Sequence, residues 1–426
     1  MVDDKTIRIL MLHDSQGKML VLLPHRQLLN LVSVWKETGR HLQPLTASDS
    51  NKFFNQQALE TESGLAKLLN LPTLIDKSCS EAQSLNLFEP HSGRHFEINR
   101  QLINAEALPC TLGLTPEAIE TKQPQGNDVT VITKAVEKFT ALRIKQRLED
   151  TLGLPTLPPT AQKIIELRAN PSAGVDDLVP IVKMDPSLSA QVMSWSASPY
   201  YAAPGSIHSI QDAIVRVLGY DLVVNLALGI AMGKTLTIPK DTPRGSTPYW
   251  LQSVYCAVLA ERLVKLMPVE DRPHPGLGYL AGLLHNFGYL ALAHIFPPHF
   301  SLVSRYVEAN PHLHHEHIEK QIINVTREQV GAWLMETWNL PEEVYRAIRY
   351  QNDTDYQGEH KKYALLVNLC LRVLRQNDIG DGPSGEIPAA LYEQLNLTPE
   401  KVEEAFERVH HKEEDLTEMT RILKAG

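Results

Sequence analysis

From Thr160 to the end of the chain, the sequence carries helix signals and no strand signal. Apolar residues recur there with helical spacing, and capping residues bracket them. Asp185 followed by Pro186 predicts a helix start, and Ser209 and Gly219 predict the start and the end of another helix. We therefore expect an all-α region. The expected helices are 161–168, 188–196, 210–218, 249–266, 278–295, 328–338, 341–349, 363–375 and 398–424.

Residues 5–110 show a different pattern, in which short apolar runs alternate with turn residues. Two such runs flank Asp14-Ser15-Gln16-Gly17, and Gly17 can supply the positive φ that a tight hairpin turn needs. This pattern predicts a mixed domain of the α/β or α+β class. The expected elements are strands at 7–12, 19–23, 71–76 and 95–98 and a helix at 28–38.

Two segments separate these regions. Residues 114–128 contain Pro116, Pro124 and Gly126 and are predicted to form a linker. Residues 129–152 carry a helical apolar stripe and are expected to form a connecting helix. The proline-rich run GLPTLPP then ends regular structure, because a helix interior does not accommodate closely spaced prolines.

Composition narrows the class of protein. A chain of 426 residues is too long for one ordinary core, and a net charge of −9 argues against a nucleic-acid surface over the whole chain. The four cysteines are scattered without a CxxC motif, which favours reduced thiols over disulfides or a zinc site. The longest apolar run, 222–232, is about half of a bilayer span, and no secretion signal is evident at the start. We expect a multidomain cytoplasmic protein without a membrane partner.

The C-terminal region resembles the HDOD domain, an all-α relative of the HD hydrolases that occurs in bacterial signalling proteins. The resemblance covers residues 147–375, where the family's motifs occur in order. It implies an HDOD domain at 147–378 after a linker and connecting helix at 116–146, with a helical extension at 379–426. The motifs are RLEDTLGLPTLPPTAQKIIEL, VKMDPSLSAQVMSWSASPYYAAPGSIHSIQDAIVRVLG, AGLLHNFGYLAL and VGAWLMETWNLPEEVYRAIRY.

The resemblance also implies where the metal centre of an HD hydrolase would lie. Such enzymes hold divalent ions with histidines and aspartates from several helices, and the ion polarises a water molecule. In this chain the central His-Asp pair is His285-Asn286, so one anionic ligand is lost. Other ligand positions also depart from the family pattern. They hold Gln252, Arg327 or Glu328, and Tyr350-Gln351-Asn352.

This eroded ligand set predicts no bound metal, no cofactor and no catalytic residue. A polar pocket could remain at the same place and bind a small ligand without turnover, or His285 could be a hydrogen-bonded core histidine. A second histidine cluster follows Pro311, where His314 and His317 lie one helical turn apart and are the remaining metal candidates, at an expected solvent-exposed helix start. The candidate pocket residues are Gln252, His285, Asn286, Tyr350 and Gln351.

The N-terminal region resembles the YbaK-type aminoacyl-tRNA deacylase domain that is associated with prolyl-tRNA synthetases. The resemblance implies a truncated domain at 1–115, without the family's leading helix and lysine, and with Gly64 alone in place of a glycine-rich loop. The basic residues that could contact tRNA are dispersed and are expected to be solvated surface: Lys18, Arg26, Lys36, Arg40 and Arg94. The segments that carry the resemblance are GKMLVLLPHRQLLNLVSVWKETGRHLQPLTASD, SGLAKLLNLPTLIDKS and SGRHFEINRQ.

Taken together, these patterns favour a non-enzymatic regulatory scaffold of a bacterial signalling pathway. It would bind a protein partner through the helical domain, and the N-terminal domain would act as a sensor or docking unit. Two alternatives stay open. One is a metal-dependent phosphohydrolase of the HD type with an unusual ligand set. The other is an aminoacyl-tRNA deacylase or tRNA-binding protein that acts through the N-terminal domain.

Overall fold

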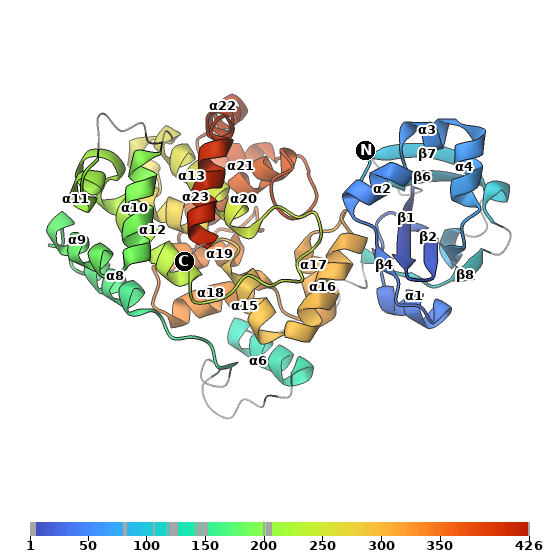
Figure 1. Cartoon of the computed structure of the whole chain (residues 1–426), viewed down its shortest axis with the longest axis horizontal. Coiled ribbons are helices and arrows are strands. Elements are labelled where there is room, and N and C mark those ends of the chain that lie inside the picture. Colours follow the sequence, from blue (N-terminus) through green and yellow to red (C-terminus); the bar gives the residue numbers. More distant parts are fainter. Residues whose placement is uncertain are drawn as a thin grey trace.

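The computed structural model of the chain describes residues 6–79, 83–104, 107–116, 118, 127–140, 142, 148, 152–198, 201 and 207–424. These residues form a smaller N-terminal lobe around a β-sheet and a larger lobe of helices (Figure 1). The lobes meet at helices α16 (Pro297–Ala309) and α17 (His315–Ile323). The expected combination of an α/β region and a helical region is confirmed.

A mixed sheet forms the centre of the N-terminal lobe. Its strands and a separate short pair are β1 (Ile7–Asp14), β2 (Gly17–Pro24), β3 (Leu28–Leu29), β4 (Gln43–Pro44), β5 (Thr73–Asp76), β6 (Ser84–Glu89), β7 (Arg94–Asn99), β8 (Leu108–Cys110) and β9 (Gly113–Leu114). The seven-stranded sheet has the order β7-β6-β1-β2-β5-β8, with β4 also paired to β1. The pairs β1–β6, β2–β5 and β5–β8 are parallel, and the others are antiparallel.

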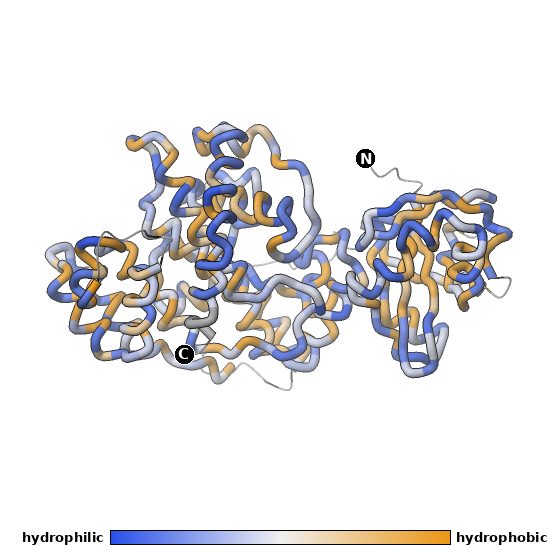
Figure 2. The backbone as a smooth tube through the Cα atoms, turned by 45° about the horizontal axis from the view of Figure 1, so that its top comes forward, coloured by the Kyte–Doolittle hydropathy of each residue, from blue (hydrophilic) through white to orange (hydrophobic). Residues whose placement is uncertain are grey.

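Helices cover both faces of this sheet, so its central strands are apolar on both sides. Alternate residues of β1 enter two different cores, because Ile9 shares a core with Leu69, whereas Leu10 shares one with Val34. Figure 2 shows the resulting apolar strands between more polar segments. The helical segments of this lobe are α1 (Leu31–Thr38), α2 (Ala47–Phe53), α3 (Gln56–Glu60), α4 (Glu62–Leu69), η1 (Lys77–Cys79) and η2 (Arg100–Leu102).

The predicted hairpin is confirmed. Asp14 pairs with Gly17 at its end, Gly17 has a φ of 135°, and its N–H donates to Asp14 Oδ1 at 3.2 Å. The strands expected at 71–76 and 95–98 are β5 and β7. The helix expected at 28–38 is wrong at its start, because Leu28–Leu29 pair with β9 and Asn30 then caps α1.

The larger lobe is helical, and its described residues after 160 contain no strand. Asp185 and Ser209 cap helices as predicted, and Gly219 ends one with a φ of 83°. Within the described residues, no single helix is long and apolar enough to cross a membrane, although the helical stretches Ile210–Leu218 and Tyr220–Gly233 together meet that test as a pair bent by 118°. The helical segments, η3 being a π-helix, are α6 (Asp128–Phe139), α8 (Pro159–Ala169), α9 (Val175–Met184), α10 (Pro186–Ala197), α11 (Ile210–Asp212), η3 (Ala213–Leu218), α12 (Tyr220–Gly233), α13 (Tyr249–Leu266), η4 (Val269–Asp271), α14 (Pro275–Leu284), α15 (Phe287–Ile295), α18 (Arg327–Thr337), α19 (Glu342–Tyr350), α20 (Lys361–Gln376), α21 (Ala389–Gln394), α22 (Pro399–His410) and α23 (Glu413–Lys424).

Two long predicted helices are each divided in the structure. The helix expected at 278–295 breaks at His285 and Asn286 into α14 and α15, and the one expected at 398–424 breaks into α22 and α23. The connecting helix expected at 129–152 corresponds to α6 as far as Phe139, and much of the remainder lies outside the described residues. The same holds for much of the linker expected at 114–128.

The two lobes are joined by a polar and well-packed interface. The side chain of Asn310, which is fully buried, accepts from Leu29 N at 2.7 Å and donates to Leu29 O at 3.3 Å, so it pairs with the backbone of β3 as a strand would. Leu28 packs with Tyr306 and Ile318 in an apolar cluster beside it. A cavity of only about 10 Å³ remains between the lobes at this side.

Arg8 of β1 lies at the centre of this interface and is fully buried. Its guanidinium donates to Ala309 O at 3.2 Å, to Asn310 Oδ1 at 3.0 Å and to Gln27 O at 3.0 Å. It also contacts His312 Nδ1 at 2.5 Å. Burial lowers the pKa of Arg8 to about 9, so the side chain is still charged at neutral pH.

The interface should loosen in acid. His25 and His312 face each other across it with ring centroids 5.0 Å apart, and burial and the charge of Arg8 lower the pKa of His25 to about 4 and that of His312 well below its usual range. Separated lobes would protonate both rings near the ordinary pKa of about 6.5, so the separated state takes up more protons. Docking should therefore be complete above about pH 6.5 and weaken progressively below it. Small-angle X-ray scattering between about pH 7.5 and pH 5 would measure the separation of the lobes. The lower limit is about 1.5 units below the ordinary pKa of histidine, and an unchanged scattering profile down to that pH would contradict the prediction.

Candidate functional site

The break between α14 and α15 places His285 and Asn286 against the start of α18. Gly288 crosses α18 so closely that a Cβ atom there would lie 1.8 Å from the carbonyl oxygen of Arg327. Gly331 lies on the other side of the same crossing, with a Cβ that would be 3.0 Å from Gly288. Two residues without side chains thus allow α15 and α18 to touch, and the helix bends at His285-Asn286 to reach that contact.

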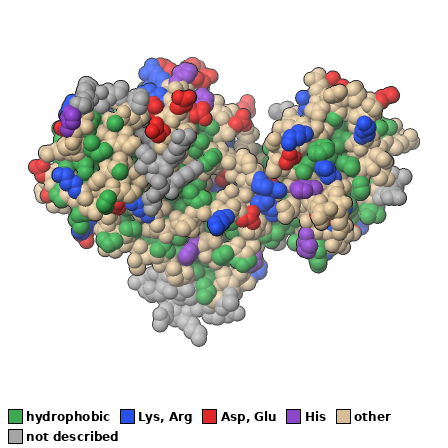
Figure 3. Space-filling view, viewed as in Figure 1, with side chains coloured by type: hydrophobic (Ala, Val, Ile, Leu, Met, Phe, Trp, Pro, Cys, Tyr) green, Lys and Arg blue, Asp and Glu red, His purple; other side chains and the backbone are tan. Residues whose placement is uncertain are grey.

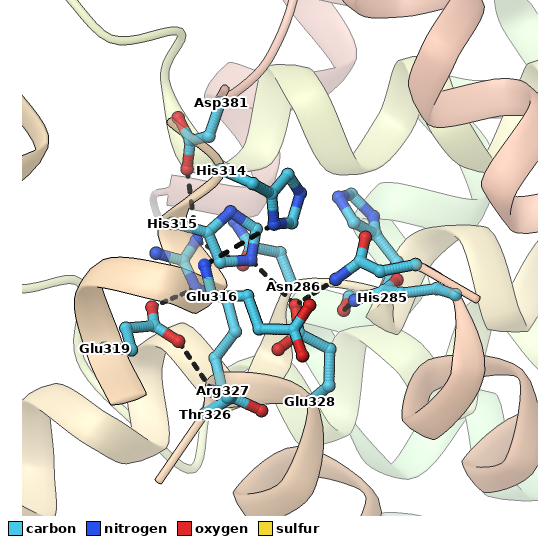
Figure 4. Close-up of polar contacts among 12 residues, drawn as sticks. His285, Asn286, His314, His315, Glu316, Glu319, Thr326, Arg327, Glu328 and Asp381 are labelled. Carbon is cyan, nitrogen blue, oxygen red and sulfur yellow. Dashed lines mark hydrogen bonds and ion pairs between the residues drawn. The ribbon is translucent and has the colours of Figure 1, made fainter. Parts of the chain in front are cut away.

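Arg327 lies at the centre of the polar cluster that results (Figure 4). Glu319 accepts twice from this residue, at Oε1 from Arg327 Nε (2.6 Å) and at Oε2 from its backbone N–H (2.9 Å). The guanidinium also donates to Asn286 Oδ1 at 3.1 Å and to Asp381 Oδ2 at 3.2 Å, and it lies 4.8 Å from the ring centre of Tyr289. Burial opposes its charge, but Glu319 and Asp381 outweigh burial and raise the pKa of Arg327.

A fixed protein cation therefore stands beside Asn286, at the place where the HD resemblance puts a divalent ion. An amide suits this neighbour, because its oxygen accepts a hydrogen bond without adding charge. Unlike a metal ion, a guanidinium has no open coordination position and cannot bind and polarise a water molecule as a Lewis acid. The residues present at the HD positions do not fit a divalent ion.

A second buried set lies next to this one. His315 Nε2 and Glu328 Oε1 are 2.7 Å apart, and Asn352 Nδ2 donates to the same oxygen at 2.9 Å. Burial alone would raise the pKa of Glu328, but His315 and Arg327 hold it well below its usual range. His315, Glu319 and Glu328 offer possible metal ligands within 4.8 Å of one another. Arg327 already donates to both oxygens of Glu319, so a metal ion bound by this group would have to displace that arginine.

The structure brings together part of the predicted pocket. Gln351 Nε2 donates to His285 O at 3.0 Å, so Gln351 lies beside the His285-Asn286 pair. Gln252 is buried on α13, and its Nε2 is 2.8 Å from the position of a Cβ at Gly380. Tyr350 lies apart from this group and stacks on Tyr356, with ring centres 4.0 Å apart.

His285 is itself a core histidine. Its Nδ1 lies 2.7 Å from Gly282 O, which fixes the proton on Nδ1, and its buried Nε2 has no hydrogen-bond partner among the described residues. Burial disfavours a charged imidazole, but the neighbouring Cys256 thiol favours it, and the pKa of His285 is raised. His285 is thus part of the packed core at the end of α14.

His314 and His317 line a cavity of about 320 Å³ next to the cluster. The expectation that they begin a solvent-exposed helix is wrong, because residues 311–320 are all at least half-buried in the contact between α17 and its neighbours. His314 Nε2 lies 3.0 Å from Arg375 Nη2, and burial together with His315 lowers the pKa of His314 well below its usual range. The structure thus assigns His314 a contact with an arginine.

The sequence placed Arg327 or Glu328 at a departed ligand position but gave no sign that these charges are buried, and it did not single out Glu319 or Asp381. Glu319 and Arg327 are buried at 0% and 3% exposure, yet the helical pattern does not distinguish them from surface charges. A signal existed in Arg372 and Arg375, which are three residues apart on a helix and therefore share a face.

A larger hollow of about 740 Å³ lies near Pro155 and Trp338, and Glu166 is the one charged residue among the described residues that line it.

The predicted basic residues of the N-terminal lobe do not gather into one surface. Arg40 pairs with Asp14 at the hairpin end, and Lys18 lies over the ring of Phe53 at 4.9 Å. On the face drawn in Figure 3, basic and acidic side chains of this lobe are interspersed. This distribution gives a nucleic-acid backbone no continuous track on that face.

Comparison with known proteins identifies the helical lobe. A family model described as the HDOD domain matches residues 154–354. The crystal structure of a candidate signal transduction protein from Marinobacter aquaeolei VT8 is 39% identical, with a TM-score of 0.88 over 99% of this chain and 94% of that chain. The HDOD resemblance is confirmed, whereas the YbaK-type resemblance of the N-terminal lobe is untested and stays a prediction.

More distant relatives share the fold or part of the sequence. The crystal structure of a candidate phosphohydrolase from Shewanella amazonensis SB2B is 19% identical, with a TM-score of 0.52 over 68% of this chain and 99% of that chain, and shows similarity of fold alone. An uncharacterized protein of Treponema pallidum (strain Nichols) is 24% identical over 279 residues, which are 63% of this chain and 52% of that protein. The chain thus spans about half the length of this curated relative.

Proposed function

Because the chain belongs to the HDOD family, we propose that it is a non-enzymatic regulatory protein of a signalling pathway. In this proposal the helical lobe retains the position of the HD site but uses it for structure and ligand binding, and the N-terminal lobe is a docking unit. The observation that carries the proposal is Arg327, whose guanidinium joins Asn286, Glu319 and Asp381 into one buried network. The signalling context is supported by the candidate signal transduction protein of Marinobacter.

The alternative of an HD-type phosphohydrolase has less support. It requires a divalent ion beside Asn286, where the guanidinium of Arg327 already neutralises Glu319 at 2.6 Å. A divalent ion there would face a fixed positive charge at close range, and that repulsion is strong in a buried site. The similarity to a candidate phosphohydrolase is one of fold, and a shared fold does not imply a shared reaction.

Metal analysis and hydrolysis assays test this proposal. Untagged protein, purified with and without added Mn²⁺, Fe²⁺ or Zn²⁺, should contain less than one ion per chain. It should leave nucleoside monophosphates, triphosphates and cyclic dinucleotides intact. Stoichiometric metal together with hydrolysis that disappears in His285→Ala would overturn the proposal. The matched control is His360→Ala, since His360 lies at the start of α20, outside the buried cluster.

Asn286→Asp alone should not create a metal site. The new carboxylate would lie about where Asn286 Oδ1 now accepts from Arg327 at 3.1 Å, and so it would form an ion pair with that residue. Gln252 and Gln351 would still stand where the HD pattern has histidines. Elemental analysis of the variant should match the wild type, and one bound ion per chain would show that the ligand positions are misassigned.

The interface supports a docking role for the N-terminal lobe rather than a deacylating one. Arg8, a basic residue of its central sheet, is fully buried against the helical lobe and is therefore unable to contact tRNA. We expect no deacylation of mischarged tRNAs and no binding of tRNA that weakens with salt. Salt-dependent tRNA binding by the full chain would favour the tRNA alternative instead.

A further inference from the structure

The cavity of about 320 Å³ beside the buried cluster has the size of a small-molecule site. Its wall includes α20 on one side and the residues that follow α19 on another. Side chains that can donate or accept hydrogen bonds converge on it, which is typical of binding pockets. Those that matter here are His314, Gln351, Asn352, Arg372, Arg375 and Ser384.

Two arginines on one face of α20 give this cavity a positive charge. Arg372 donates to Asn368 Oδ1 at 2.8 Å and to Glu386 O at 3.2 Å. Arg375 donates to Asp381 O at 2.7 Å and contacts His314 at 3.0 Å. All of these partners are uncharged groups, and among the described residues neither arginine forms an ion pair with a carboxylate.

Burial makes these unpaired charges costly. It lowers the pKa of Arg372, and it lowers that of Arg375 to about 10 although Asp381 and Glu328 oppose the shift. Both side chains remain protonated at neutral pH. The acidic side chain in the cavity wall, Glu316, is already paired with Lys320 at 2.7 Å. Partly buried guanidinium groups without a counter-ion are stabilised when an anion binds between them.

The cavity also offers neutral groups for the rest of a ligand. The Oε1 atom of Gln351 is buried without a hydrogen-bond partner among the described residues, so an acceptor is available for a ligand hydroxyl or amine. Asn352 already donates to Glu328, and Gln351 donates to His285 O. A molecule in the cavity would therefore contact the same side chains that hold the buried cluster together.

We propose that this cavity binds a phosphate-bearing small molecule, with the phosphate between Arg372 and Arg375 and the remainder toward Gln351. The proposal deepens the regulatory function proposed above and rests on it. Arginine suits this task, because its planar guanidinium matches phosphate oxygens in two parallel hydrogen bonds. The chemical class of the ligand is therefore an organic or inorganic phosphate.

Calorimetric titration of the full chain tests the proposal. The probes are inorganic phosphate, a hexose phosphate and a nucleoside monophosphate, and glucose and the nucleoside are their uncharged counterparts. At least one phosphate probe should bind and its uncharged counterpart should not. Binding of inorganic phosphate as tight as that of the organic probes would identify the phosphate alone as the ligand, whereas tighter organic probes would identify a phosphorylated metabolite. No binding of any phosphate probe would overturn the proposal.

Arg372→Gln and Arg375→Gln locate the site. Each should weaken binding by about tenfold or more, and the double variant should abolish it. Glutamine keeps a hydrogen-bond donor for the neutral partners of each arginine, so the melting temperature of each ligand-free variant should stay close to that of the wild type, which separates loss of binding from misfolding. Arg346→Gln is the matched control, since Arg346 on α19 pairs with Glu342 at 2.9 Å and lies outside the cavity wall. Wild-type affinity in the double variant would overturn the site.

The outcome also separates this inference from the proposed function. Binding without metal or hydrolysis supports both. Binding accompanied by metal-dependent cleavage of the probe would retain the phosphate site and overturn the non-enzymatic function. Absence of both binding and hydrolysis would overturn the phosphate site alone.

Discussion

Replacing Arg327 with Met is expected to destabilise the protein by about 3–5 kcal/mol, the usual cost of removing one partner of a buried ion pair. Glu319 has 0% exposure and directs both oxygens at Arg327, and Asp381 loses the same partner. Methionine leaves these charges buried without compensation, while it keeps a similar volume. The free energy of unfolding, from urea denaturation at pH 7.5, would measure the loss.

The same variant has a characteristic pH dependence. Burial raises the pKa of Glu319 even in the intact protein, where Arg327 opposes that shift, so the loss of Arg327 should raise it further. The pKa of such a glutamate is higher in the folded protein than in the unfolded chain, where it is about 4.3. Its contribution to stability is therefore complete below about pH 4.3 and is lost as the pH rises through the folded pKa. The deficit of Arg327→Met should therefore be smaller near pH 5 than at pH 7.5.

Two further variants identify the cause of the loss. Arg346→Met removes a partly exposed pair on α19 and should cost less than about 1 kcal/mol. Arg327→Met combined with Glu319→Leu should recover part of the stability, because removal of both charges leaves fewer buried groups unpaired. A loss below about 1 kcal/mol for Arg327→Met itself would show that the network does not hold the cluster together.

Arg8→Met is expected to separate the N-terminal lobe from the helical lobe. It removes the donor to Ala309 O and Gln27 O, two acceptors at the interface, whereas Asn310 Oδ1 keeps its hydrogen bond from Leu29 N. Each acceptor that loses its donor costs about 1–3 kcal/mol, so the free energy of docking should weaken by about 3 kcal/mol. This corresponds to a change of more than about a hundredfold in the docking equilibrium. Small-angle X-ray scattering should show a larger radius of gyration, and proteases should release the lobe faster.

Arg40→Met is the matched control for this variant. Arg40 lies in the same lobe and is also largely buried, but it pairs with Asp14 at the hairpin end and not with the helical lobe. It should leave the scattering profile unchanged. Asn310→Leu, which alters the other side of the contact, should reproduce the effect of Arg8→Met. Unchanged scattering in both interface variants would contradict docking of the lobes through Arg8 and Asn310.

Separation of the lobes is expected to change the candidate site, because the segment that leads into α17 contacts both. Asn310 and His312 hold the N-terminal lobe, and His315, three residues beyond His312, contacts Glu328 in the buried cluster. His314 lies between them and contacts Arg375 in the wall of the proposed phosphate site. The docking surface, the cluster and the cavity therefore share one short segment of chain.

Helix caps and the hairpin turn could be predicted from the sequence, because they depend on residues that are neighbours in the chain. Asp185, Ser209 and Gly219 act as predicted, because a cap depends on a few neighbouring backbone groups. The hairpin at Gly17 formed for the same reason. The motif order likewise determined the HDOD family of the helical lobe.

The errors lie where distant segments meet. Leu28–Leu29 became a strand because β9 supplies a partner more than 80 residues away in the sequence. The helix expected at 278–295 bends because Gly288 and Gly331 allow α15 to touch α18. Neither partner can be recognised from the local pattern, since contact between them depends on how the helices and strands pack.

The sequence by itself determined the class of each lobe and the family of the helical lobe, and it has an amide at Asn286 where the HD resemblance expects a carboxylate. Only the tertiary structure decided which side chains surround Asn286. Hydrophobic periodicity and capping are local properties of the sequence. The role of Arg327, in contrast, depends on its ion pairs with Glu319 and Asp381, which come from other segments of the chain. Burial converts these surface-like charges into a network, and burial is a property of the packed chain.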